Sequence, residues 1–263
     1  MPPPPHLAVA QSNYQELSLY SHIPAARHPQ ILRVISGITG MLPETTLEHH
    51  LVYKPKRPRQ PGQNAELYYL QLISIVPDEK KQEEEGEGEG GRGAGKNNKE
   101  EGGKGYDVKT QKWRTRLEDI PEVTRKPVTS RNVLGAGFGE GDALALVDSL
   151  GYMLQTAYFM TVSTLIHNNI IITLSQVLLP PPAPASADPV PGQQYGNPYP
   201  TSGLQPLDPA RSWVLKAAVR VQSHQDVESI NTGVNELKGF KELMRGMCDL
   251  EVAERLALDT RVR

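Results

Sequence analysis

The sequence predicts a mainly β protein, a closed antiparallel β-barrel of about eight strands with a few flanking helices. Three observations support this fold class. About eight short segments alternate polar with apolar residues or are rich in β-branched and aromatic side chains. Turn-forming residues separate them along the chain. Only three segments carry the apolar spacing of an amphipathic helix.

The candidate strands are distributed along most of the chain. The segment around Trp113 alternates apolar and polar residues, and His167, Asn168 and Asn169 indicate a turn because asparagine tolerates positive φ. The predicted strands are residues 16–20, 45–53, 66–76, 108–117, 128–134, 153–162, 170–178 and 213–221.

Two helices are predicted near the amino terminus and in the middle of the chain. The first begins at Pro29, where the missing amide donor costs nothing, and Gly40 with Pro43 ends it. A short second helix is expected over about 142–150.

The third predicted helix, about 226–247, is the longest. Gly233 and Gly239 weaken it by about 1 kcal/mol each relative to alanine. Its apolar residues form one stripe, which is most simply a helix lying on the barrel. The stripe consists of Ile230, Val234, Leu237, Phe240 and Met244.

Two internal tracts have compositions that cannot bury apolar surface. Glu79–Gly105 contains only Glu, Lys, Arg, Gly, Gln, Asn and Ala, which predicts a disordered tether. Pro180–Pro209 carries ten prolines and should hold no regular element. We therefore predict a disordered tail over 1–14 and a single barrel domain over 15–263, with disordered insertions at about 79–105 and 180–209.

Composition limits the protein classes that fit. The net charge of −2 and the pI near 6.4 give no support for a nucleic-acid or membrane-surface protein. Cys248 is the only cysteine, which excludes an internal disulfide, favours a reducing compartment and predicts a small buried thiol. The most apolar stretch, Ile166–Leu179, is too short and too polar to span a bilayer, so we expect a soluble protein.

No catalytic or ligand-binding pattern is complete. Gly135 to Gly141 alternate with other residues but lack the spacing of a dinucleotide or phosphate loop, so a flexible connection is expected there. Glu85, Glu87 and Glu89 fall in the charged tract. No G-x-S-x-G sequence is present. We predict no catalytic residue, no metal ligand and no cofactor.

The histidines do not form a metal site. His49 and His50 are adjacent, so on a strand they point to opposite faces and cannot easily share an ion. We expect one of them to be buried and hydrogen-bonded and the other to be exposed. His167, in the predicted turn, is expected to be structural.

A basic cluster, residues 54–59, follows the second predicted strand. It could be a nuclear localisation signal, a contact for an acidic partner or a solvated loop. The residues alone leave these readings open.

Several phrases in this sequence together resemble one known family. In order, they are Leu17–Tyr20, Ile23–His28, Glu48–Pro55, Lys126–Arg131, Ser149–Tyr152, Ile166–Asn169, Asn235–Lys238, Phe240–Met244, Asp249–Leu250 and Arg255–Arg261. They are similar, in this order, to the family of the eighteenth subunit of Mediator, the coactivator complex of RNA polymerase II transcription.

The resemblance implies a non-catalytic structural subunit of the Mediator head module in the nucleus, folded as a β-barrel carrying helices. It also implies three partners: the twentieth subunit, in a barrel–barrel heterodimer; the C-terminal helix of the eighth subunit; and RNA polymerase II, through the assembled head. Direct sequence-specific nucleic-acid binding and membrane association are not expected.

The family's barrel is related to tunnel-type metal-dependent triphosphatases, which makes such a phosphohydrolase the alternative function. Those enzymes need Glu-x-Glu-x-Lys strands that hold a divalent ion in the lumen. The strands here carry instead Glu48 with His50, Glu66 with Tyr68, and Lys216 with Arg220. A lumen without paired carboxylates is expected to have lost that chemistry. A binding module outside transcription, acting through an added strand or a helix groove, is a third possibility.

Overall fold

The computed structural model describes residues 11–56, 66–77, 106–123, 126–138, 142–181, 199–223 and 225–262. Its strands are β1 (Gln11–Ile23), β2 (Glu44–Pro55), β3 (Leu70–Ile75), β4 (Arg114–Glu118), β5 (Thr129–Gly137), β6 (Tyr152–His167), β7 (Ile170–Leu179), β8 (Gln205–Pro206) and β9 (Trp213–Val221). Its helices are α1 (His28–Thr39), α3 (Ala143–Ser149) and α4 (Val227–Leu243), with short 3-10 helices η1 (Ala25–Arg27), η2 (Val108–Thr110) and η3 (Arg255–Leu258).

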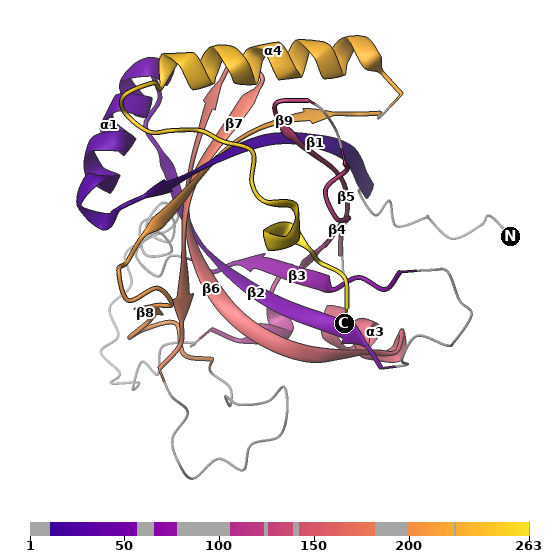
Figure 1. Cartoon of the computed structure of the whole chain (residues 1–263). Coiled ribbons are helices and arrows are strands. Elements are labelled where there is room, and N and C mark those ends of the chain that lie inside the picture. Colours follow the sequence, from indigo (N-terminus) through magenta and orange to yellow (C-terminus); the bar gives the residue numbers. More distant parts are fainter. Residues whose placement is uncertain are drawn as a thin grey trace, which may run out of the picture.

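Eight of the strands form a closed antiparallel barrel (Figure 1). Their order is β6-β2-β3-β4-β5-β1-β9-β7, and β7 closes the ring by pairing with β6 over nine residue pairs, from Phe159–Leu178 to His167–Ile170. The predicted fold class is confirmed.

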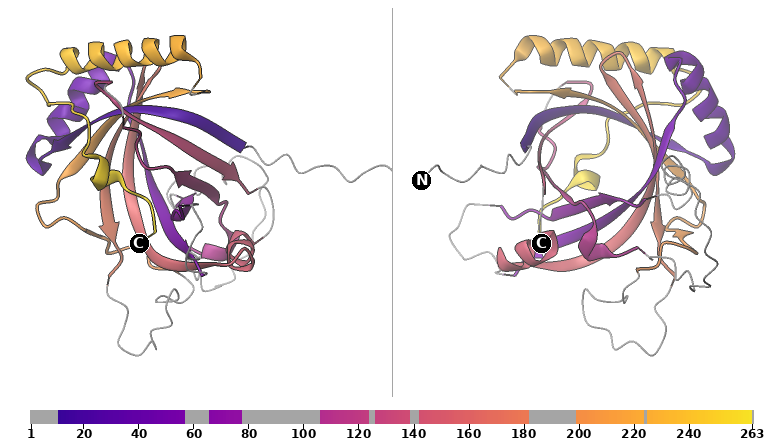
Figure 2. Two further views of the ribbon diagram at one scale, coloured as in Figure 1. Left: turned by 45° about the vertical axis from the view of Figure 1, so that its right-hand side comes forward. Right: turned by 180° about the vertical axis from the view of Figure 1, so that it is seen from behind.

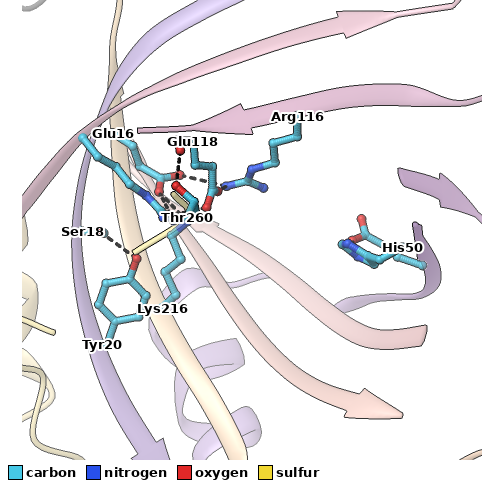
Figure 3. Close-up of polar contacts among 10 residues, drawn as sticks. Glu16, Ser18, Tyr20, His50, Arg116, Glu118, Lys216 and Thr260 are labelled. Carbon is cyan, nitrogen blue, oxygen red and sulfur yellow. Dashed lines mark hydrogen bonds and ion pairs between the residues drawn. The ribbon is translucent and has the colours of Figure 1, made fainter. Parts of the chain in front are cut away.

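The main apolar core lies on the outside of the barrel wall. Successive side chains of a strand point to opposite faces, and on β1 Leu17 and Leu19 pack outward while Glu16 and Ser18 point into the lumen (Figure 3). The outward residues of β1, β7 and β9 are covered by α1 and α4. The helices are therefore needed to bury the outer face, and the lumen holds charged side chains beside a few apolar ones, such as Val133 and Ile73.

Helix α4 crosses the outer face of β9 and β1 (Figures 1 and 2). Its N-cap, Asp226, accepts a hydrogen bond from the Ser229 amide at 3.0 Å. All five residues of the predicted stripe are buried. The helix ends at Leu243, four residues earlier than predicted, and turns follow to Met247.

The other two helices also agree with their signals. Gly40 ends α1 in the left-handed conformation, with φ 67°. Asp142 caps α3, which packs Ala143 and Val147 on a second outer cluster containing Leu51 and Trp113. None of the described helices is long and apolar enough to cross a bilayer.

The predicted strand over 108–117 is wrong in its first half. Val108–Thr110 is a 3-10 helix capped by Asp107, which accepts from the Lys109 amide at 2.9 Å. The Trp113 indole donates to the Val108 carbonyl at 2.9 Å and holds this turn against the barrel. The strand itself is confined to Arg114–Glu118.

Two segments are more regular than predicted. β1 begins at Gln11, inside the expected tail. In the proline-rich range, Gln205 and Pro206 form β8 on the end of β7, and the Leu207 amide donates to the Val177 carbonyl at 2.9 Å. Residues 78–105, including the alternating glutamates, and 182–198 lie outside the described residues, so disorder there stays a prediction.

The glycine-alternating segment is a strand in its first part, contrary to the expected flexible connection. Gly135 and Gly137 belong to β5 and pair with β4. A Cβ on Gly135 would lie 2.7 Å from the Ser12 hydroxyl oxygen, so glycine permits the close approach of β1. Residues 139–141 lie outside the described residues.

Candidate functional site

The most concentrated chemistry of the described chain is an ion cluster in the barrel lumen (Figure 3). It combines side chains from four strands: Glu16 of β1, Arg116 and Glu118 of β4, Arg131 of β5 and Lys216 of β9. Strand register places Arg131 directly opposite Glu16, whereas Lys216 lies opposite Tyr20 and its long side chain reaches back along the wall.

Each carboxylate in this cluster is held by two or three cations. Glu16 lies 2.6 Å from the Lys216 ammonium, 3.5 Å from the Arg131 guanidinium and 3.7 Å from that of Arg116. Glu118 lies 2.5 Å from Arg116 and 2.6 Å from Arg131. Both arginines therefore bridge the two carboxylates.

Glu16 stays ionised although it is buried. Burial alone would raise the pKa of Glu16, but Lys216, Arg116 and Arg131 together lower it from 4.5 to about 2. Burial lowers the pKa of Lys216, and the Glu16 carboxylate opposes that shift. The cluster contains three basic side chains and two acidic ones.

A second polar group lies in the same lumen, on β2 and its neighbours. The Glu48 carboxylate is 3.0 Å from His50 Nε2 and 2.7 Å from the Arg114 guanidinium. The His50 ring stacks on Tyr158 at 4.9 Å between centroids. Burial would raise the pKa of Glu48, but its bonds to His50 and Arg114 lower it overall.

His49 points the other way, as predicted, but the expectation that one of the two histidines is exposed is wrong. His49 is fully buried on the outer face, between Phe159, Tyr199 and Tyr106, whose hydroxyl lies 3.1 Å from Nδ1. Burial, with a smaller effect of His50, lowers its pKa to about 3. His50 is only 4 % exposed because barrel closure encloses the inner face too.

The expectation of a lumen without paired carboxylates needs correction. No strand carries the Glu-x-Glu pair, and β1 has Glu16, Ser18 and Tyr20 at the alternating positions. Glu16 and Glu118, from different strands, nevertheless share the guanidiniums of Arg116 and Arg131. Their oxygens bind arginine and lysine, and no group of three or more His, Cys, Asp or Glu suited to a metal occurs in the described part of the chain. The relation to triphosphatase barrels stays a prediction.

Other residues singled out by the sequence lie apart from the cluster. Arg220 covers the Tyr14 ring at 4.8 Å. Lys56, from the basic cluster, pairs with Asp148 at 2.6 Å, and residues 57–59 lie outside the described residues. Cys248 is 8 % exposed, which confirms the buried thiol.

Sequence reasoning missed most of the ion cluster. Glu16 and Arg131 stand within predicted strands, where a charged side chain on a buried face is unusual. That signal could have marked them as candidates. Their partners depend on which strands are neighbours, which the sequence does not state.

These features define a class of protein: a closed antiparallel barrel with helices on its outer wall and a lumen whose ionised side chains pair with one another. The sequence model of the Med18 protein family matches residues 15–261. The chain belongs to the Med18 family.

Individual relatives agree with this assignment. Mediator of RNA polymerase II transcription subunit 18 of Aspergillus fumigatus is 30 % identical over 276 residues, covering 94 % of this chain and 99 % of the relative. The same subunit of Yarrowia lipolytica is 25 % identical over 253 residues, covering 95 % and 100 %. A chain of the Schizosaccharomyces pombe Mediator head module has the same fold, with a TM-score of 0.64 at 23 % identity and coverage of 91 % and 98 %.

Proposed function

We propose that the chain is a non-catalytic structural subunit of Mediator, acting in the nucleus in RNA polymerase II transcription. The observation that carries this proposal is the family match over residues 15–261, together with relatives that are covered almost end to end. The lumen is consistent with it, because each carboxylate of the ion cluster contacts at least two cations of this chain.

The same family resemblance supports a finer proposal about partners. The chain pairs with Mediator subunit 20 as a barrel–barrel heterodimer, is tethered to the head module by the C-terminal helix of subunit 8, and meets RNA polymerase II only through the assembled head. The function then lies in surfaces of the barrel and its helices and needs no substrate.

Affinity purification tests the assembly. The full chain carrying a small epitope tag is purified from nuclear extract of its own organism, and the bound proteins are quantified by mass spectrometry. We expect subunits 20 and 8 in near-stoichiometric amounts, with the rest of the head. A folded, nuclear protein that recovers none of these subunits contradicts the proposal.

Phosphate release tests the non-catalytic part. The purified chain is incubated with inorganic tripolyphosphate and Mg²⁺ or Mn²⁺, and free phosphate is compared with a heat-inactivated control. We expect no difference. Metal-dependent release that Glu16→Gln abolishes in a folded protein would instead support the tunnel-type phosphohydrolase, because Glu16 is the most enclosed lumen carboxylate of the cluster.

A further inference from the structure

The barrel wall is incomplete beside the end of the β4–β5 hairpin. β5 pairs with β1 only as far as Ser18, opposite Thr129, so the edge of β1 beyond that point has no β5 partner. On the other side, residues 66–69 precede β3 and extend past the end of β4, whose Leu117 pairs with Leu70. The C-terminal segment crosses this opening (Figures 1 and 2). We call residues Glu251–Val262 the strap.

The strap is fastened at its two ends by backbone hydrogen bonds. Tyr20 and Glu251 exchange two bonds of 2.8 Å, as opposed residues of an antiparallel pair do. Residues 260–262 pair with residues 67–69 through bonds of 2.9 and 2.7 Å. Each end thus replaces, over a few residues, the strand neighbour that β1 and β3 lack there.

The middle of the strap adds little apolar burial. Arg255 Nε donates to the Pro121 carbonyl at 2.7 Å. Val252 is 49 % exposed and Leu256 58 % exposed. The Asp259 side chain is enclosed, at 4 % exposed, and it pairs with Arg261 within the strap. Leu250, directly before the strap, is fully buried in the outer core. The fixed part of the chain therefore ends at Leu250, and the strap can leave without removing core contacts.

The ion cluster lies directly behind the strap. Figure 3 places Thr260 beside Glu118, Arg116 and Lys216, and the Thr260 hydroxyl donates to the Glu118 carbonyl. Water that enters here hydrates ionised groups, beside the buried apolar side chain of Val133, which is paired with Glu118. Opening of the strap removes no residue from the outer apolar core, and segments with few buried contacts open most readily.

We propose that the strap is a gate, which opens while the barrel and its helices stay folded and which controls access to the ion cluster in the lumen. With the strap in place the Lys216 and Arg116 side chains are 19 % and 26 % exposed. The open state exposes them further, together with Glu16, Glu118, Arg131 and the unpaired edge of β1. This inference goes beyond membership of Mediator, since an assembly role alone requires no access to the lumen.

The test measures how fast Lys216 reacts with a small amine-acylating reagent in the full chain, read by peptide mass spectrometry. Lys238, exposed on α4, is the internal reference. Arg261→Ala loosens the strap, because Arg261 pairs with Glu66 and Asp259 at 2.8 Å each. Arg245→Ala is the matched control, since it removes an exposed arginine ion pair on the turn after α4.

We expect Arg261→Ala to speed labelling of Lys216 by about two- to fivefold, the range given by loss of a partly exposed ion pair. Lys238 should be unaffected, and Arg245→Ala should change neither rate. An unchanged Lys216 rate in folded Arg261→Ala would overturn the proposal. So would an increase that occurs only together with accelerated exchange of the α4 amides.

Hydrogen exchange of the unaltered chain gives an independent reading if Arg261→Ala folds poorly. The amides of Glu251 and Val262, both hydrogen-bonded in the strap, should exchange well before the amide of Leu237 in the buried face of α4. Exchange of all three in one cooperative step would show that the strap opens only when the barrel unfolds, and would refute the gate.

Discussion

Two glycines in α4 give a matched pair of substitutions with opposite expected effects. Both lie in the interior of the helix, where alanine is favoured over glycine by about 1 kcal/mol. A Cβ at Gly239 would meet nothing within 4 Å. Gly239→Ala is therefore expected to raise the free energy of unfolding by about 1 kcal/mol, since it limits the unfolded chain without a clash.

Gly233 is different because it lies against the barrel wall. A Cβ there would come within 3.0 Å of Val219 Cγ1 and 3.1 Å of Leu17 Cδ1, both in the outer core. Overpacking of this kind costs about 1–3 kcal/mol, which outweighs the gain in helix propensity. We expect Gly233→Ala to lower the free energy of unfolding by about 1 kcal/mol net.

Urea unfolding of the full chain measures both effects, followed by far-UV circular dichroism and by tryptophan fluorescence. The midpoints should shift in opposite directions while the slopes stay equal, which indicates that stability alone has changed. If Gly233→Ala is as stabilising as Gly239→Ala, then α4 does not pack as closely on β1 and β9 as the structure has it.

Substitutions at three further positions test the lumen, the outer aromatic cluster and the β6–β7 turn. The pKa of Glu16 falls from 4.5 to about 2 on folding, so the ionised carboxylate contributes about 3 kcal/mol to the free energy of unfolding above pH 4.5. This contribution is lost as the pH falls toward 2. Glu16→Gln should therefore reduce the difference between the free energies of unfolding measured in urea at pH 7 and at pH 3.5. The pKa of His49 falls from 6.5 to about 3 on folding, so the free energy of unfolding should decline by about 1.4 kcal/mol for each pH unit below 6.5. His49→Phe should reduce the slope of the free energy of unfolding against pH, between pH 6.5 and 4.5, by the amount that corresponds to one proton. Asn168 has φ 52°, so Asn168→Ala should lower the free energy of unfolding by about 1 kcal/mol and Asn168→Gly should be close to neutral; equal losses would contradict the turn geometry.

Elements with a local signal were predicted well. The stripe of α4, the asparagine turn before β7 and the glycine end of α1 all depend on residues close together in the chain. Each of the eight predicted strand segments overlaps one strand of the barrel, and β8 was the strand not predicted. Family membership also followed from the sequence, because it depends on the order of short phrases.

Errors arose where a side-chain contact decided the outcome against the polar–apolar alternation. Residues 108–110 were predicted as strand but form a 3-10 helix, which the hydrogen bond from the Trp113 indole to the Val108 carbonyl holds in place. His50 is buried because the barrel closes around it and stacks Tyr158 on its ring. The His50–Tyr158 contact joins two strands far apart in the chain, whereas the Trp113–Val108 bond spans five residues and does not show in the polar–apolar alternation.

The sequence by itself determined the strands, the helices, the barrel class and the family of this protein, since polar–apolar periodicity and turn chemistry act over short range. Only the tertiary structure decided that the lumen is an ion cluster and that the C-terminal strap lies across its opening. Glu16 pairs with Arg131 and with Lys216, which lies 200 positions further along the chain, and Arg131 also pairs with Glu118. Such meetings depend on strand order and register, which closure of the whole barrel fixes.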